Sequence, residues 1–353
     1  MLLRLLVVAL AIVGSSAAWA QPTVIDPGQG SVALSSGATA AAELSGITHV
    51  GGTTYQAVGD NAAATIWTLS ISLDPASGWI GSAGVTGGIA APALGTDSEG
   101  IAYRAASGTV FVSDEVASTI GEFSLTTGSL VGSVNVPAIY TPSNVQSNMG
   151  LESLAFGPGG LWTTNEEALV PDGPLSTTTA GSWVRIQRFD ASLAAIRQWG
   201  YRTDPITALN PFISAERSGV VDILPWTETE LLVLERELGG AVVPQFRSRL
   251  YLVDTDTASD VSALATINAG GFTPLSKTLL WERSFAASNF EGMTFGPTLN
   301  DGSRSLLLIS DDGGGLAQNL YALAVVPEPS LAMLGSTAVA AGWLFVRRRS
   351  RLA

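Results

Sequence analysis

Carboxylates recur at similar places along this chain. One set of acids leads short apolar segments, at Glu43, Glu99, Glu152, Asp222 and Glu291. A second apolar segment follows each of these after a turn and ends in an acid or amide, at Asp60, Asp114, Asn165, Glu235 and Asp311. Carboxylate and amide oxygens are the ligands that hard cations prefer, so the pattern points to Ca²⁺ first and Mg²⁺ second.

Most other catalytic chemistry is excluded by composition. The chain has no cysteine, so disulfides, thiolate metal sites and cysteine nucleophiles are absent. A Ser-His-Asp triad would rest on His49, the single histidine, and no Gly-x-Ser-x-Gly motif occurs. We expect His49 to be a surface or hydrogen-bonded residue rather than a base. The formal net charge is −13, and several arginines lie at the ends, so the body repels nucleic acid.

The first 20 residues are typical of a secretory signal peptide. Arg4 precedes an apolar stretch, and Ala18-Trp19-Ala20 forms a small-x-small cleavage site. We therefore expect export and cleavage by signal peptidase before Gln21, an uncleaved membrane anchor being the alternative.

The C-terminal residues 327–353 have three parts in order. Pro327-Glu328-Pro329 comes first, an apolar segment over 331–346 follows, and an arginine cluster from Arg347 ends the chain. Sixteen apolar residues are short for a transmembrane helix, which needs about 20. The order resembles a PEP-CTERM sorting signal, which implies recognition by an exosortase-type enzyme at the bacterial cell envelope. A plain C-terminal anchor is the alternative.

Residues 21–326 between these segments repeat one acid-led pattern. Clear copies start at Glu99, Glu152 and Glu291, each with a strand-like run, a turn and a second apolar run. Long amphipathic helical patterns are nearly absent. The leading acids lie 53 to 70 residues apart. Repeats of this length that consist of strands and turns predict an all-β fold, a single β-propeller of five four-stranded blades. A sixth blade in the long third or fourth repeat stays open, and residues 23–34 are expected to supply the strand missing from the last blade. A β-sandwich is the alternative fold.

Innermost propeller strands converge on a central channel, so the recurring acids are expected to meet at one mouth. We predict catalytic roles for Glu99, Glu152, Glu291 and Arg236. We predict metal-ligand roles for Glu43, Asp60, Asp114, Glu235 and Asp311. Two alternatives remain. The acids could cap turns inside each blade, and Arg236 could form an internal salt bridge instead of binding an anionic substrate.

The assembled segments resemble the "esterase-like activity of phytase" family of exported bacterial propeller proteins. The similarity rests on pieces such as Glu99-Gly100-Ile101, Leu151–Phe156, Leu231–Glu237 and Phe290-Glu291-Gly292. It implies a propeller that hydrolyses phosphoesters or carboxyl esters, and the recurring acids predict calcium at its mouth. The alternative is a non-catalytic surface protein that binds the extracellular polysaccharide matrix, because fold alone does not decide function. In either case we expect a monomer.

Overall fold

The computed structural model describes residues 21–60, 63–207, 217–239 and 245–327. Within them, Val24–Val326 form one compact unit. The predicted signal peptide and the apolar C-terminal segment lie outside the described residues. No helix in the described ranges is long and apolar enough to cross a membrane.

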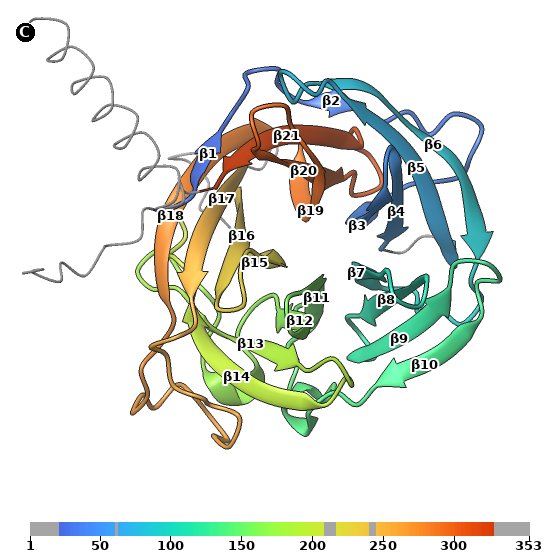
Figure 1. Ribbon diagram of the computed structural model, residues 1–353. Coiled ribbons are helices and arrows are strands. Elements are labelled where there is room, and N and C mark those ends of the chain that lie inside the picture. The colour runs from blue at the N-terminus through green and yellow to red at the C-terminus, as the bar shows by residue number, and fades with distance from the viewer. Residues whose placement is uncertain (1–20, 61–62, 208–216, 240–244, 328–353) are drawn as a thin grey trace, which may run out of the picture. The chain divides into compact units, whose positions relative to one another are not determined.

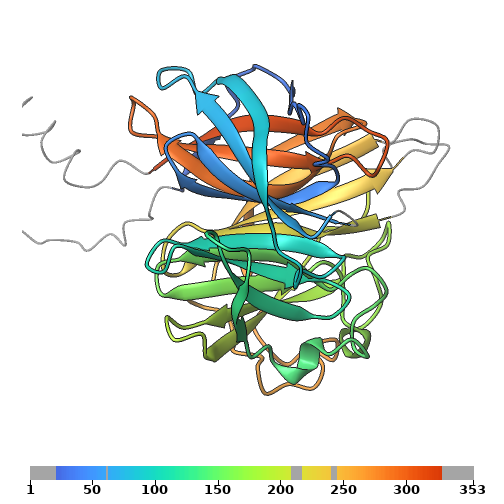
Figure 2. The same ribbon diagram turned by 90° about the vertical axis from the view of Figure 1, so that its right-hand side faces the viewer.

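Residues 24–326 form five antiparallel sheets around a central channel, as Figures 1 and 2 show from two sides. The first blade contains β3 (Leu44–Gly51), β4 (Thr54–Gly59), β5 (Thr65–Leu73) and β6 (Ile80–Ala90). The second contains β7 (Ser98–Arg104), β8 (Thr109–Asp114), β9 (Thr119–Ser124) and β10 (Leu130–Val134). The third contains β11 (Leu151–Gly157), β12 (Gly160–Asn165), β13 (Trp183–Phe189) and β14 (Ala195–Arg202). The fourth contains β15 (Arg217–Pro225), β16 (Glu230–Gly239), β17 (Gln245–Asp254) and β18 (Ser276–Ala286).

The fifth blade joins the two ends of the propeller. Its strands β19 (Asn289–Thr298), β20 (Arg304–Asp311) and β21 (Asn319–Val326) come from the end of the body, and β1 (Thr23–Ile25) pairs with β21 at the outer edge. The short β2 (Val32–Ala33) also pairs with β21. The predicted five blades and the closing role of residues 23–34 are therefore confirmed. The described parts of the long repeats contain 3₁₀ turns and loops and form no sixth blade.

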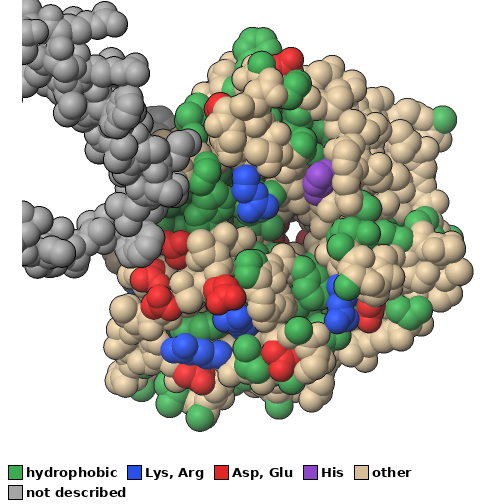
Figure 3. Space-filling model, viewed as in Figure 1, with side chains coloured by type: hydrophobic (Ala, Val, Ile, Leu, Met, Phe, Trp, Pro, Cys, Tyr) green, Lys and Arg blue, Asp and Glu red, His purple; other side chains and the backbone are tan. Residues whose placement is uncertain are grey.

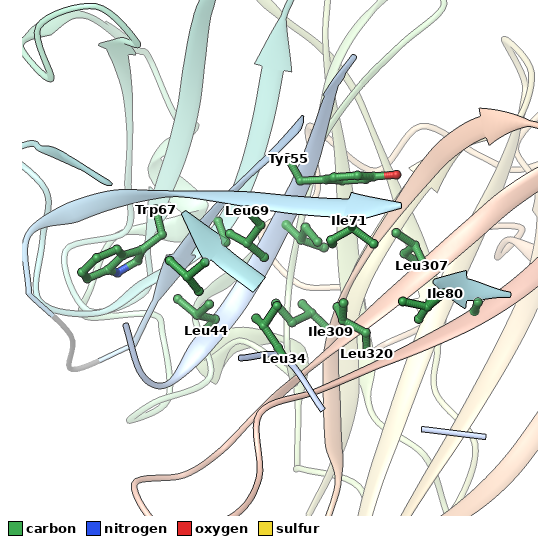
Figure 4. Close-up of a cluster of buried hydrophobic side chains, with 14 residues drawn as sticks. Leu34, Leu44, Tyr55, Trp67, Leu69, Ile71, Ile80, Leu307, Ile309 and Leu320 are labelled. Carbon is green, nitrogen blue, oxygen red and sulfur yellow. The ribbon is translucent and has the colours of Figure 1, made fainter. Parts of the chain in front are cut away.

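Hydrophobic clusters fill the interfaces between neighbouring blades. Along β20, Leu307 and Ile309 pack against the first blade, whereas Leu306 and Leu308 pack against the fourth. Figure 4 shows the first of these clusters. Because successive side chains of a strand point to opposite faces, a strand covered on both sides needs a continuous apolar run. This explains why the second strand of each repeat is so uniformly hydrophobic.

Small residues allow the innermost strands to approach closely around the channel. A Cβ atom on Gly46 would lie 2.1 Å from the backbone oxygen of Glu99 in the next blade. A Cβ atom on Gly292 would lie 2.2 Å from the backbone oxygen of Ser45, again one blade further. The glycine that follows the leading acid in several repeats therefore serves blade packing, because a larger residue would push two backbones apart.

We predict that Gly292→Ala lowers the free energy of unfolding by about 1–3 kcal/mol, because the added methyl group meets backbone that cannot move independently. Chemical denaturation of the full chain measures the loss. Gly87→Ala is the matched control, since a Cβ atom there meets nothing within 4 Å. Equal stability of the two variants would contradict the proposed packing role.

Candidate metal centre at the channel mouth

A β-bulge near the start of each innermost strand places one extra residue at the mouth. The pairing register shifts at this point in all five blades. The residues at the shift are Ser45, Glu99, Glu152, Val221 and Glu291. A bulge bends the strand and redirects a side chain. Equivalent positions therefore carry an acid in three blades. Ser45, not Glu43, corresponds to Glu99 in the first blade, and Val221, not Asp222, does so in the fourth.

A second ring of residues comes from the second strand of each blade or from the position directly after it. In every blade, the residue before the bulge pairs with the one just preceding this ring, as Ser98 pairs with Asp114 and Val220 with Glu235. The ring members are Asp60, Glu115, Glu166, Arg236 and Asp311. Four acids and one arginine thus occupy equivalent places around the channel.

Seven of the ten ring residues line one cavity of about 220 Å³, and Ser45, Val221 and Glu115 do not. Among the predicted residues it brings together Glu99, Glu152, Glu291, Arg236, Asp60 and Asp311. Glu166 also lines the cavity. The expectation that acids from several blades share one mouth is met by these residues.

Two groups of carboxylates are close enough to share a cation. Oxygens of Glu99, Glu115 and Glu152 all lie within 4.8 Å of one another, and so do oxygens of Asp60, Asp97 and Glu99. Glu99 belongs to both groups. One oxygen of Glu115 accepts the Gly150 backbone N–H at 2.7 Å, whereas its other oxygen is buried without a hydrogen-bond partner.

The chemistry of these donors fits a hard cation. All of them are carboxylate oxygens, which Ca²⁺ and Mg²⁺ accept and soft metals do not favour. A buried carboxylate oxygen without a donor costs free energy unless a proton or a cation satisfies it. Glu99, Glu115 and Glu152 are therefore the residues best placed to hold Ca²⁺.

Burial and crowding raise the pKa of the mouth carboxyls. Burial, followed by the Glu166 charge, raises the pKa of Glu115 to about 8. Burial and the neighbouring Asp60 raise the pKa of Asp97 to about 7. Burial raises the pKa of Glu99 and Glu152 well above the usual range, and neighbouring glutamates add to both shifts. Like charges in a desolvated site cannot all stay ionised, so a cation at this mouth would take the place of protons.

Arg236 is the basic member of the second ring and is held by two ion pairs. Its Nη2 lies 2.9 Å from Oε1 of Glu166 and 2.7 Å from Oε1 of Glu291. Burial opposes its charge, but Glu291 and Glu166 outweigh that effect and raise the pKa of Arg236. The internal salt bridge considered from the sequence is therefore present. The same arrangement orients Glu291, whose pKa burial still raises to about 7.

The predicted positions of Asp114 and Glu235 at the mouth are wrong. Asp114 lines a separate cavity beside β7 and accepts the Ala117 backbone N–H at 2.6 Å. Glu235 accepts hydrogen bonds from Tyr201 and Lys277 at the interface of the third and fourth blades. Each precedes the ring residue by one position, and adjacent side chains point to opposite faces of a strand.

Two other leading acids also lie outside the cavity lining. Glu43 stays near the mouth, where burial raises its pKa and the charges of Asp311, Asp60 and Asp312 add to the effect. Asp222 accepts the backbone N–H groups of Met293 and Ile223, so it ties the fourth blade to the fifth. This is the structural role that the sequence left open for some of the acids.

The sequence reasoning missed Glu115, Glu166 and Asp97. A signal for the first two exists, since the second strands end in Ser113-Asp114-Glu115, Thr164-Asn165-Glu166 and Leu234-Glu235-Arg236. Aligning these ends on their last residue gives the ring directly. Asp97 precedes β7 and has no counterpart that the repeat pattern would reveal.

Comparisons with solved structures return proteins of low sequence identity. Glutaminyl cyclase of Myxococcus xanthus is 9% identical, with a TM-score of 0.38 over 86% of this chain and 97% of the cyclase. The WD40 β-propeller domain of Doa1 is 8% identical, with a TM-score of 0.32 over 87% and 96%. Hydrazine synthase of Kuenenia stuttgartiensis is 11% identical, with a TM-score of 0.32. The match covers 76% of the present chain and 56% of the hydrazine synthase chain. No curated protein sequence matches.

A family comparison is more informative. Residues 39–314 match the phytase-like family described as "Esterase-like activity of phytase". The matched range covers well over half of the chain and includes both rings of mouth residues from Glu43 to Asp311. The protein therefore belongs to this phytase-like family, whose resemblance was noted in the repeat segments.

Proposed function

We propose that this protein hydrolyses phosphoesters or carboxyl esters at the channel mouth with the help of Ca²⁺. Membership of the phytase-like family supports a hydrolase-like function. The observation that carries the proposal is the buried group Glu99, Glu115 and Glu152, whose oxygens converge within 4.8 Å while one of them lacks a donor.

The mouth residues divide into two roles. Glu99, Glu115 and Glu152 would hold Ca²⁺, and Asp60 and Asp97 offer a second set of oxygens beside Glu99. A bound cation polarises a phosphoryl or ester oxygen and makes a nearby water more acidic. Such a site also needs a base on the protein to accept a proton from the attacking water.

Glu291 is best placed to accept that proton. It lines the same cavity, and Arg236 fixes its orientation through the 2.7 Å ion pair. Its pKa is raised to about 7, so near neutral pH a substantial fraction of Glu291 is ionised and can still accept a proton readily. We propose Arg236 as a positioning residue that also limits repulsion between Glu291 and Glu166.

The cellular setting remains as the sequence indicates. We propose that signal peptidase removes residues 1–20, that an exosortase-type enzyme processes the tail, and that the body acts at the cell envelope or in the extracellular matrix. The acidic charge of the chain is consistent with substrates delivered as cation complexes.

An activity panel on the full chain tests the function. We expect calcium-dependent turnover of p-nitrophenyl phosphate, phytate or p-nitrophenyl acetate, lost with EDTA and restored by added Ca²⁺. Absence of turnover on every substrate, with calcium binding shown directly, would reject the hydrolase. It would favour the alternative of a binding protein, for which adhesion to the producer's exopolysaccharide is the assay.

A further inference from the structure

The opposite end of the channel carries a second pocket with different chemistry. Each innermost strand runs from the acidic mouth toward it, and Tyr103 lies four residues, about 13 Å, beyond Glu99. The pocket has a volume of about 230 Å³ and is lined by residues of all five innermost strands, together with Arg304 of β20. Its lining contains no acidic residue. Figure 3 views the channel end-on, with basic and histidine side chains beside the opening.

Arg304 is held in this pocket by aromatic rings. Its guanidinium carbon lies 3.6 Å from the ring centroid of Phe295 and 5.7 Å from that of Trp226. The described residues place no carboxylate in an ion pair with it. Arg185, Arg236 and Arg249, the more deeply buried arginines, all have one. Burial with nothing to offset it lowers the pKa of Arg304. A half-buried guanidinium fixed on a ring therefore keeps its N–H donors available.

The remaining walls combine polar groups with apolar side chains, and polar atoms make up most of the surface exposed in the pocket. The Thr48 hydroxyl oxygen accepts the Tyr103 backbone N–H at 3.1 Å, so its own proton can be donated elsewhere. The Thr294 hydroxyl accepts the His49 backbone N–H at 3.1 Å. Aliphatic and aromatic side chains make up most of the rest, namely Ile47, Ile101, Leu154, Leu224, Met293, Phe156 and Phe295.

We infer that this pocket binds a small organic carboxylate, independently of any hydrolysis at the acidic mouth. The planar fork of Arg304 matches the two oxygens of one carboxylate. The Thr48 hydroxyl supplies a further donor, and the apolar side chains of the wall are available to contact the organic part of the ligand. Inorganic phosphate is a poorer match, because the lining offers a doubly charged anion one arginine and no lysine.

Benzoate is a suitable probe because it combines one carboxylate with a flat apolar body. We expect saturable binding in calorimetry and a change in tryptophan fluorescence, since Trp226 lies beside Arg304. Arg304→Met keeps the length of the side chain and removes its charge, and it should weaken benzoate binding at least 10-fold. Arg202→Met is the matched control. Arg202 also stacks on a tryptophan, with 4.8 Å between its guanidinium carbon and the Trp183 ring centroid, but lies exposed on β14.

Thermal melting of each variant shows whether it is folded. Should Arg304→Met fail to fold, Arg304→Lys keeps the charge but not the fork, and it should still bind benzoate several-fold more weakly than the parent. Undetectable benzoate binding by the parent protein would overturn the inference. A folded Arg304 variant that binds benzoate with the same affinity as the parent protein would also overturn it. Inorganic phosphate that binds the pocket as tightly as benzoate would show that an inorganic anion satisfies the site. This result would reject an organic carboxylate as the ligand class.

Discussion

Glu99→Gln should weaken calcium binding and calcium-dependent hydrolysis together, by on the order of 100-fold or more. Glu99 is the one residue shared by both carboxylate groups at the mouth, so its loss removes a charged ligand from each. Even residues that only orient a ligand typically change metal affinity 10- to 100-fold when mutated. Calorimetric titration with Ca²⁺ and turnover of the best substrate measure the two effects on the same preparation.

Without calcium the same substitution should act in the opposite direction. Burial and neighbouring carboxylates raise the pKa of Glu99, so its ionised form destabilises the folded chain. When folding raises the pKa of a carboxyl, the protein loses stability as the pH rises from the pKa of the unfolded state to that of the folded state. Replacing it by a neutral amide removes that loss, and Glu99→Gln in EDTA should be at least as stable at pH 8 as the parent.

Two variants make this result specific. Glu152→Gln removes a ligand from one group only, leaving Asp60, Asp97 and Glu99, so its effect on calcium affinity should be smaller than that of Glu99→Gln. Glu228→Gln makes the same chemical change at an exposed position and should alter neither calcium binding nor stability. Calcium affinity that is unchanged in Glu99→Gln would reject the mouth as the calcium site.

Fold prediction from sequence worked because the propeller repeats one simple pattern. The second strand of a blade carries apolar side chains on both faces where it lies between two neighbouring blades, as Leu306–Ile309 illustrates. A pattern that depends on burial survives variation in loop length. The same reasoning placed the closing strand correctly, since a last blade with three strands leaves an unpaired edge that another segment has to cover.

Site prediction was limited by one residue of register. The prediction took the acid or amide at the end of each second apolar run, and in two blades this choice, Asp114 and Glu235, lies one residue before the position that belongs to the mouth ring. The structure places Glu115 and Arg236 in the mouth rings instead. A side chain moved by one position faces the opposite side of the strand. Glu43 lies two residues before the bulge of its strand, so it stays near the mouth without lining the cavity, whereas Glu99, Glu152 and Glu291 sit at the bulge itself.

The pairing of Arg236 illustrates what spacing does not show. Its two carboxylate partners come from the third and fifth blades, at Glu166 and Glu291. These residues lie far from it along the chain on either side. Their meeting depends on the closure of the ring rather than on any local motif. The sequence therefore left both a substrate contact and an internal salt bridge open for Arg236, and contacts across blades were needed to show the ion pairs.

Arg236→Met should destabilise the calcium-free protein by about 3–5 kcal/mol. The substitution leaves Glu166 and Glu291 as buried charges without their partner, and breaking one side of a buried ion pair typically has this effect. The loss should be greater at pH 8 than at pH 6. Burial already raises the pKa of Glu291 to about 7, and removal of the arginine raises it further. Protonation then relieves the repulsion at the lower pH, so chemical denaturation at both pH values measures the difference.

A double variant separates the loss of the ion pairs from the loss of packing. Arg236→Met combined with Glu291→Gln removes one of the two stranded charges and should recover part of the stability, most clearly at pH 8. Arg104→Met serves as the control, since Arg104 is half-buried, donates to the backbone oxygen of Ala191 and forms no ion pair within the described part of the chain. A loss below about 1 kcal/mol in Arg236→Met, comparable to that control, would mean that the mouth carboxyls are already protonated and need no compensating charge. Their repulsion would then no longer argue for calcium.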